Sequence, residues 1–125
     1  MKRNEEHNAQ AALFQWAFLE CRRMPELALL FAVPNGGNRN ARTGAMMKRE
    51  GVRKGIPDIF LLCPRGKYHG MVLEMKSSTG SVKPEQKWWH QRFAEQGYHV
   101  TVCYSFEQAR EEIENYLAQP KAKLC

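Results

Sequence analysis

Apolar and polar positions alternate along the chain in two ways, which together predict eight elements. Apolar residues at helical spacing predict a first helix over residues 6–23 and a last helix over residues 106–117. Two further helices, expected over residues 41–50 and 84–96, are delimited by proline and glycine residues. Apolar runs of strand length predict strands over residues 27–33, 59–63, 71–73 and 98–104. This order predicts an α/β fold, a small mixed β-sheet flanked by helices.

The length of 125 residues suits one hydrophobic core, so we expect a single domain over residues 1–119 and a flexible C-terminal tail over residues 120–125. No apolar run approaches the roughly 20 residues that span a bilayer, and the first residues lack the apolar stretch of a secretory signal. We therefore expect a cytoplasmic protein without a membrane partner. The four cysteines form no Cys-x-x-Cys pair, which predicts reduced thiols and no zinc site.

Two acids lie beside the predicted strands over residues 59–63 and 71–73. Asp58 precedes the first strand and Glu74 follows the second, with a Pro-Arg-Gly-Lys turn between the strands. Side chains alternate along a strand, so Glu74 and Lys76 are expected on one face and Met75 on the other. Carboxylates at the edge of an apolar core need a partner, and a hard divalent cation suits two converging acids.

This set of residues suits phosphodiester hydrolysis. Asp58 and Glu74 are expected to hold Mg²⁺, with Mn²⁺ as a substitute, and Lys76 to orient the attacking water or to stabilise the developing charge. The alternative is that Glu74 and Lys76 form an ordinary solvated ion pair, which is the usual meaning of an isolated Glu-x-Lys. The preceding Gly-x-Pro-Asp segment over residues 55–58 favours the catalytic interpretation.

Basic residues outnumber acids, 19 against 13, which gives a formal net charge of +6 and favours a polyanionic partner. The segment over residues 38–54 contains a single acid, Glu50, and leads directly into Asp58. Its six basic residues are expected to bind nucleic acid: Arg39, Arg42, Lys48, Arg49, Arg53 and Lys54. The alternative for this segment is a solvated helix face.

The Pro57-Asp58 pair and the Glu74-Met75-Lys76 run resemble the motif of the PD-(D/E)XK nuclease superfamily. More narrowly, the chain resembles a stand-alone VRR-NUC (virus-type replication-repair nuclease) domain. The narrower resemblance covers nearly the whole chain and rests on segments in the family's order: 33–37 (VPNGG), 51–58 (GVRKGIPD), 74–76 (EMK), 84–88 (PEQKW) and 97–98 (GY). It implies a restriction-endonuclease-like α/β/α core.

The resemblance also implies further site residues. A family glutamate, four residues before a glutamine on the first helix, joins the metal ligands, and here it corresponds to Glu6, with Gln10 as the glutamine. Glu5 and Glu20 are the alternatives for this third acid. The backbone carbonyl of Met75 is implied to bind metal, and Gln86 to support the site by holding a water or the lysine. Lys83 stands where the family often has a small hydroxyl residue, which predicts a weaker helix cap.

Aromatic residues and histidines add little to this prediction. Of Trp88 and Trp89, one is expected to pack toward the sheet with Phe93 and the other to be exposed or in a contact. The four histidines show no metal-ligand spacing, and no catalytic role is expected for them.

Taken together, these features predict a metal-dependent, structure-selective DNA endonuclease. Stand-alone members of the resembled family are similar to Holliday-junction resolvases, which implies a homodimer acting on branched or four-way junction DNA in bacterial or phage DNA processing. The alternatives are a nicking, flap-cutting or restriction-like nuclease, and a non-catalytic basic nucleic-acid-binding module.

Overall fold

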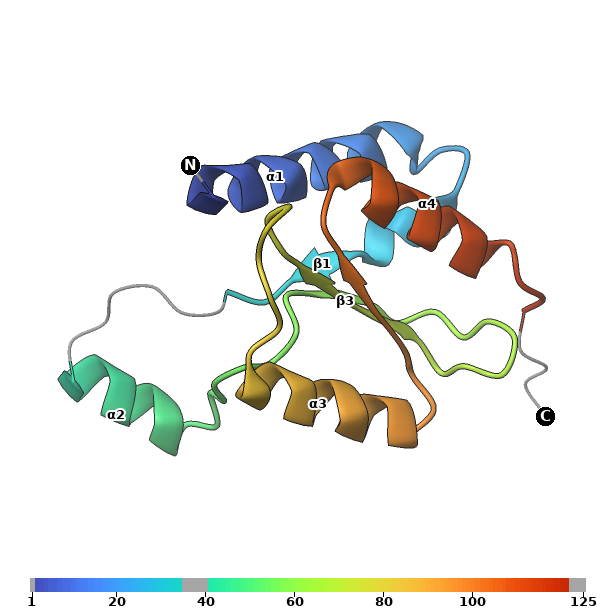
Figure 1. Ribbon diagram of the computed structural model, residues 1–125. Helices are drawn as coiled ribbons and strands as arrows, with labels where there is room; N and C mark the ends of the chain where they lie inside the picture. The colour runs from blue at the N-terminus through green and yellow to red at the C-terminus, as the bar shows by residue number, and fades with distance from the viewer. Residues whose placement is uncertain (1, 35–40, 122–125) are drawn as a thin grey trace.

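The computed structural model describes residues 2–34 and 41–121, which form four α-helices, one 3₁₀-helix (η1) and four strands (Figure 1). In chain order they are α1 (Lys2–Glu20), η1 (Pro25–Leu29), β1 (Phe31–Ala32), α2 (Ala41–Arg49), β2 (Ile59–Leu61), β3 (Met71–Met75), α3 (Pro84–Glu95), β4 (His99–Cys103) and α4 (Phe106–Leu117). The predicted fold class is therefore confirmed.

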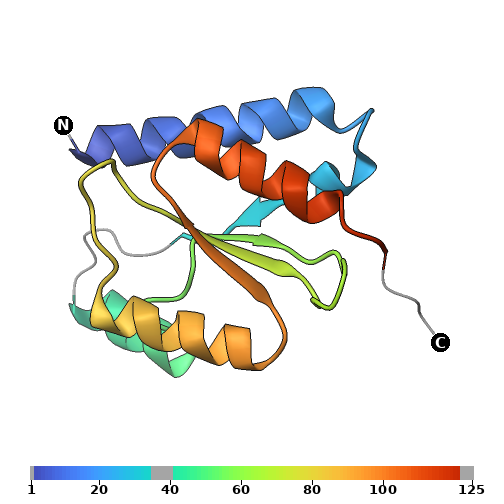
Figure 2. The same cartoon turned by 45° about the vertical axis from the view of Figure 1, so that its right-hand side comes forward.

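The strands form one mixed sheet in the order β1-β2-β3-β4. β2 runs antiparallel to both β1 and β3, whereas β4 runs parallel to β3. Helices α1 and α4 lie side by side over one face of the sheet, and α3 lies on the opposite face with α2 on the same side (Figures 1 and 2). The parallel pair requires a crossover, which α3 provides between β3 and β4.

The hydrophobic core lies between the sheet and the α1–α4 pair. Leu13 of α1, Leu73 of β3 and Ile113 of α4 are completely buried there or nearly so. Since side chains alternate along β3, Glu74 points away from this core, toward the face that α3 covers. Glu74, the polar residue of β3, therefore lies between the sheet and α3.

The strand predicted over residues 27–33 is largely wrong, because the structure has η1 followed by the two-residue β1 in this segment. Pro25 occupies the first turn of η1, where its missing N–H costs nothing. Leu27 and Leu30 are three residues apart, and both are buried, which suits the three-residue turn of a 3₁₀-helix. A short apolar run fits a buried helical turn as well as a strand.

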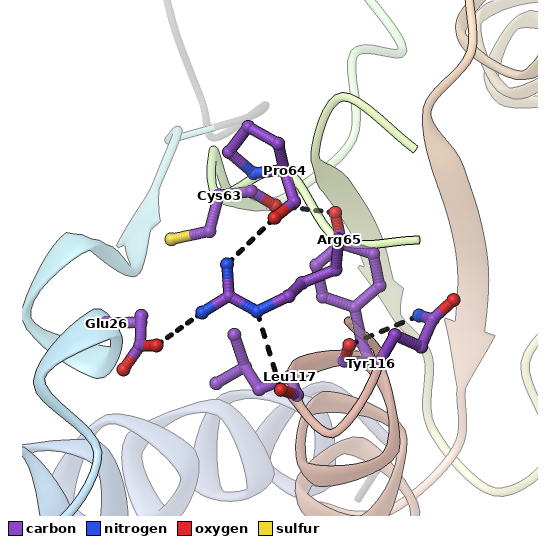
Figure 3. A network of polar contacts seen from close by, with 7 residues as sticks. Glu26, Cys63, Pro64, Arg65, Tyr116 and Leu117 are labelled. Carbon is purple, nitrogen blue, oxygen red and sulfur yellow. Dashed lines mark hydrogen bonds and ion pairs between the residues drawn. The ribbon is translucent and has the colours of Figure 1, made fainter. Parts of the chain in front are cut away.

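The turn of the β2–β3 hairpin is fastened to η1 and α4 through Arg65, which is only 5% exposed (Figure 3). Its guanidinium donates to three groups: the Glu26 carboxylate, the Pro64 carbonyl at 2.8 Å and the Leu117 carbonyl at 3.4 Å. The Tyr116 hydroxyl donates to the Cys63 carbonyl at 2.6 Å. These bonds satisfy buried polar groups that would otherwise be costly.

The predicted tail begins with two residues that contact this same hairpin turn. The Pro120 carbonyl accepts the Gly66 N–H at 2.7 Å, and Lys121 forms an isolated bridge with Arg65. The boundary at residue 119 remains a prediction, and residues 122–125 lie outside the described chain. None of the described helices is long and apolar enough to cross a bilayer.

Candidate active site

Two carboxyl groups meet where β2 begins and β3 ends. Ile59 pairs with Leu73 in the antiparallel register, so Asp58 and Glu74 lie opposite each other one position further out. Their side chains are hydrogen-bonded, and Oδ2 of Asp58 also accepts the backbone N–H of Met75 at 2.9 Å. Glu74 is only 1% exposed. Strand pairing thus brings together two acids that are well separated in the sequence.

The loop before Asp58 is held against the start of α3. Gly55 has a φ of +86°, and a Cβ there would lie 2.9 Å from the Glu85 side chain, so only glycine fits without a shift. On the other side, the carbonyl of Asp58 accepts the N–H of Val33 at 2.7 Å. These contacts fix the backbone on both sides of the Asp58 carboxyl group.

Burial raises the pKa of both acids. Burial, the hydrogen bond to Glu74 and repulsion from Glu74 raise the pKa of Asp58 to about 8. Burial also raises the pKa of Glu74, against the opposing effects of the hydrogen bond from Asp58 and of Lys76. Because two neighbouring buried carboxyls cannot both be charged without a counter-charge, Asp58 keeps its proton near neutral pH.

This pair fits a divalent cation. A cation would supply the positive charge that the proton of Asp58 supplies in its absence. Mg²⁺ commonly binds through one or two carboxylates while keeping several waters. Within residues 2–34 and 41–121, no group of three His, Cys, Asp or Glu side chains is arranged as a metal site. Asp58 and Glu74 remain the predicted ligands from the β2–β3 hairpin, and so does the Met75 carbonyl.

Lys76 lies on the same side of the sheet and is held by α3. It is 8% exposed, and its Nζ donates to Oε1 of Gln86 at 2.8 Å. The same oxygen accepts the backbone N–H of Lys83 at 2.9 Å, so the Gln86 side chain also caps the first turn of α3. Gln86 thus ties the ammonium group of Lys76 to the start of the helix.

The three candidates for a third acid occupy different places on α1. Glu6 is half-buried and close enough to Glu74 to raise the pKa of Glu74. Oε1 of Glu5 accepts the backbone N–H of Ser78 at 2.7 Å, in the loop after β3. Glu20 is the last residue of α1 and pairs with Arg23 at 2.7 Å. The geometry favours Glu6, whose role as a ligand remains a prediction.

Sequence reasoning missed His90 as a site residue. Its Nε2 lies 3.2 Å from Oε1 of Glu74, and its side chain is 13% exposed. Burial, together with the charge of Lys76, lowers the pKa of His90, while Asp58 opposes this shift. The spacing of His90 one helical turn after Gln86 was the available signal, since both side chains then share one face of α3.

The predicted basic surface lies on and after α2. Arg42, Lys48, Arg49, Arg53 and Lys54 are all exposed, and no residue of α2 is buried. Arg39, the sixth basic residue, lies outside the described residues. The segment is joined to α3 where the Trp89 indole donates to the Lys54 carbonyl at 2.9 Å. This bond places the end of the basic surface beside the loop that leads to the two acids.

The tryptophans divide as predicted. Trp89 packs against Phe93, with ring centroids 6.0 Å apart, whereas Trp88 is 52% exposed. The Arg92 guanidinium lies over the Trp88 ring, 5.3 Å from its centroid. Trp88 therefore already has a cationic partner from its own helix.

Two comparisons with known proteins name the same domain family. A family model described as the VRR-NUC domain matches residues 1–107. A solved structure described as a "VRR_NUC domain protein" superimposes with a TM-score of 0.80 at 24% identity, covering 94% of this chain and 91% of the other, which shows the shared fold. No curated protein sequence matches the chain. The family model covers most of the chain and includes every candidate acid, so the chain belongs to the VRR-NUC domain family, nucleases of the PD-(D/E)XK type.

Proposed function

We propose that this nuclease is a Mg²⁺-dependent endonuclease that cuts branched DNA, in the manner of a Holliday-junction resolvase. The observation that carries the proposal is the pair of acids Asp58 and Glu74, which the β2–β3 register places opposite each other with Glu74 fully buried. A pair held in this way has a fixed geometry and a strong preference for added positive charge. It is therefore ready to bind a cation without reorganisation.

The residues around the pair have distinct roles in this proposal. Asp58 and Glu74, with Glu6 and the Met75 carbonyl, would hold Mg²⁺ or Mn²⁺, which supplies a Lewis acid and a bound water of lowered pKa. Lys76 orients the attacking water and stabilises the negative charge that develops on the phosphate. Gln86 keeps the Lys76 ammonium in place through its 2.8 Å bond. Catalysis then depends on positioning and electrostatics.

The basic surface supports recognition of DNA by its backbone. Exposed arginine and lysine side chains neutralise phosphates without reading bases, so affinity depends on charge and on the shape of the DNA. The surface leads through Lys54, whose carbonyl accepts a hydrogen bond from Trp89 of α3, into the loop that precedes Asp58. A DNA strand whose phosphodiester lies beside Asp58 would therefore continue along the basic surface of α2.

A homodimer completes the proposal. Two copies related by a twofold axis would carry two catalytic sites, which suits paired cuts on strands of a four-way junction with the same symmetry. We place this activity in bacterial or phage DNA processing, in the cytoplasm. The basic surface and the paired acids would suit cutting at a DNA end, flap or nick equally well. The cleavage experiment therefore compares DNA substrates directly.

The test compares a labelled four-way junction with a linear duplex of the same arm sequence, in Mg²⁺, Mn²⁺ or EDTA. Glu74→Ala is the inactive variant, and Glu111→Ala, an exposed residue of α4, is the matched control. Paired symmetric nicks in the junction alone, absent in EDTA and in Glu74→Ala, are the expected result. Equal cutting of both DNAs would replace the resolvase with a general nuclease, and binding without metal-dependent cutting would refute the proposed activity.

A further inference from the structure

α3 presents a stripe of side chains to the sheet that is polar at one end and aromatic at the other. Gln86, His90 and Phe93 are separated by four and three residues, so they lie on one face of the helix. Phe93 packs edge-on against Phe60 of β2, with ring centroids 5.9 Å apart. His90 therefore occupies an inward position, between an apolar contact and the catalytic residues.

An imidazole in this position needs a polar partner, because a buried unpaired donor is costly. The partner is Glu74, whose Oε1 lies 3.2 Å from Nε2 of His90. One turn earlier, Gln86 makes the corresponding contact with Lys76. The glutamate and the lysine of the Glu-x-Lys motif are thus each held by one residue of the same helical face.

We propose that His90 is a positioning residue that holds the Glu74 carboxylate in the orientation required to bind the divalent cation. This inference rests on the proposed metal dependence, but not on the choice of DNA substrate. With its proton on Nε2, His90 donates to one oxygen of Glu74, which restricts rotation of the carboxylate. The other oxygen of Glu74 would then be available to bind the cation.

The expected effect follows from the role of outer-shell partners in metal sites. A hydrogen bond to a ligating carboxylate fixes its orientation, and loss of such a partner typically lowers metal affinity about 10–100-fold. An alternative role for His90 is simple filling of the space between α3 and the sheet. Two amide substitutions separate these roles, since the amide nitrogen of Gln reaches the position of Nε2 and that of Asn reaches only the position of Nδ1.

The experiment measures Mn²⁺ binding to the DNA-free protein by calorimetry, for the wild type and for His90→Gln, His90→Asn and His90→Leu. His99→Leu is the matched control, because His99 also faces a glutamate, Glu112, at 3.8 Å but lies on β4. Thermal unfolding in EDTA accompanies each titration, so that a loss of folding is distinguished from a loss of binding.

We expect His90→Gln and His99→Leu to bind Mn²⁺ like the wild type, and His90→Asn and His90→Leu to bind about 10–100-fold more weakly while remaining folded in EDTA. Wild-type affinity in His90→Leu, or equal weakening in the Gln and Asn variants, would overturn the positioning role alone. Absence of Mn²⁺ binding in the wild type would overturn the inference together with the proposed metal dependence. If the wild type binds Mn²⁺ but cuts junction and linear DNA equally in the cleavage experiment, only the proposed substrate is overturned.

Discussion

At the scale of single residues, the raised pKa of Asp58 links the stability of the protein to pH. Between the ordinary aspartate pKa of 3.8 and the folded value of about 8, the folded chain keeps a proton that the unfolded chain has released. Stability in EDTA should therefore be greatest at the acid end of this window and decrease as pH rises toward 8. Asp58→Asn cannot release a proton there, so its stability should decrease less.

Denaturant unfolding of the wild type and Asp58→Asn in EDTA, at about pH 5 and about pH 8, measures this difference. Added Mg²⁺ should stabilise the wild type more at the higher pH, because cation and proton compete for the same oxygens. An equal decrease in both proteins would contradict the raised pKa of Asp58.

The side-chain oxygen of Gln86 accepts two hydrogen bonds, one from the Lys76 ammonium and one from the backbone N–H of Lys83. It therefore both positions Lys76 and caps α3. Gln86→Ala should slow DNA cleavage about 10–100-fold, through loss of lysine positioning. It should also destabilise the protein by about 1 kcal/mol, through loss of the helix cap. Single-turnover cleavage and denaturant unfolding test the two effects, with Gln91→Ala, an exposed position of α3, as the control. Unchanged cleavage in Gln86→Ala would refute the positioning.

The sequence allowed the central part of the site to be predicted because its residues lie on one hairpin. The alternation of side chains places Glu74 and Lys76 on one face, and short-range pairing then brings Asp58 opposite Glu74. His90 could not be found in this way. Its contact with Glu74 depends on how α3 packs on the sheet, and local periodicity does not specify that distance.

At the scale of elements, α2 is expected to act through charge and not through packing. Arg42 and Arg49 lie seven residues apart, on one exposed face of the helix. Changing both to glutamine should weaken binding of all DNA substrates. It should also lower the slope of log binding constant against log salt concentration by about one to two. Thermal stability should not change, since neither side chain is buried.

Fluorescence anisotropy over a series of salt concentrations, in EDTA, measures this effect on duplex and junction DNA. Lys67→Gln, an exposed change in the β2–β3 turn, removes one positive charge away from α2 and serves as the control. An equal loss in the control would mean that net charge, and not the position of α2, determines binding.

The β2–β3 hairpin depends on Arg65 for its attachment to η1 and α4. Arg65→Ala leaves the partly buried Glu26 without its partner and removes bonds to two carbonyls. We therefore expect a loss of about 3 kcal/mol in the free energy of unfolding. Denaturant unfolding measures it, with Lys67→Ala in the same turn as the control. A change as small as that of the control would show that the network contributes little.

The last two helices were predicted most accurately: α4 has the predicted bounds, and α3, between Pro84 and Gly97, ends one residue early. The segment over residues 27–33 failed because its apolar run is too short to distinguish a strand from a buried helical turn. Burial of Leu27 and Leu30 against α1 and the sheet decides the structure there. That choice depends on long-range packing, which propensity alone does not contain.

At the scale of the whole molecule, the proposed homodimer predicts a solution mass twice that of one chain. Analytical ultracentrifugation over a range of concentrations measures this mass directly. Mixed dimers of wild-type and Glu74→Ala subunits should nick only one strand of each junction, because each twofold-related site cuts its own strand. A single-chain mass at all concentrations, or paired nicks from mixed dimers, would contradict the dimeric mechanism.

The antiparallel β2–β3 hairpin runs from the candidate active site to the opposite side of the molecule. The acids lie at its open end, whereas its turn, fastened by Arg65 and bridged to Lys121, lies at the other end. Figure 1 shows this turn on the same side as the end of α4. A fluorophore or an affinity tag joined after Lys121 would therefore start from the side remote from the candidate active site. The same arrangement would let a second domain follow this one in a fused polypeptide while the nuclease end remained open to DNA.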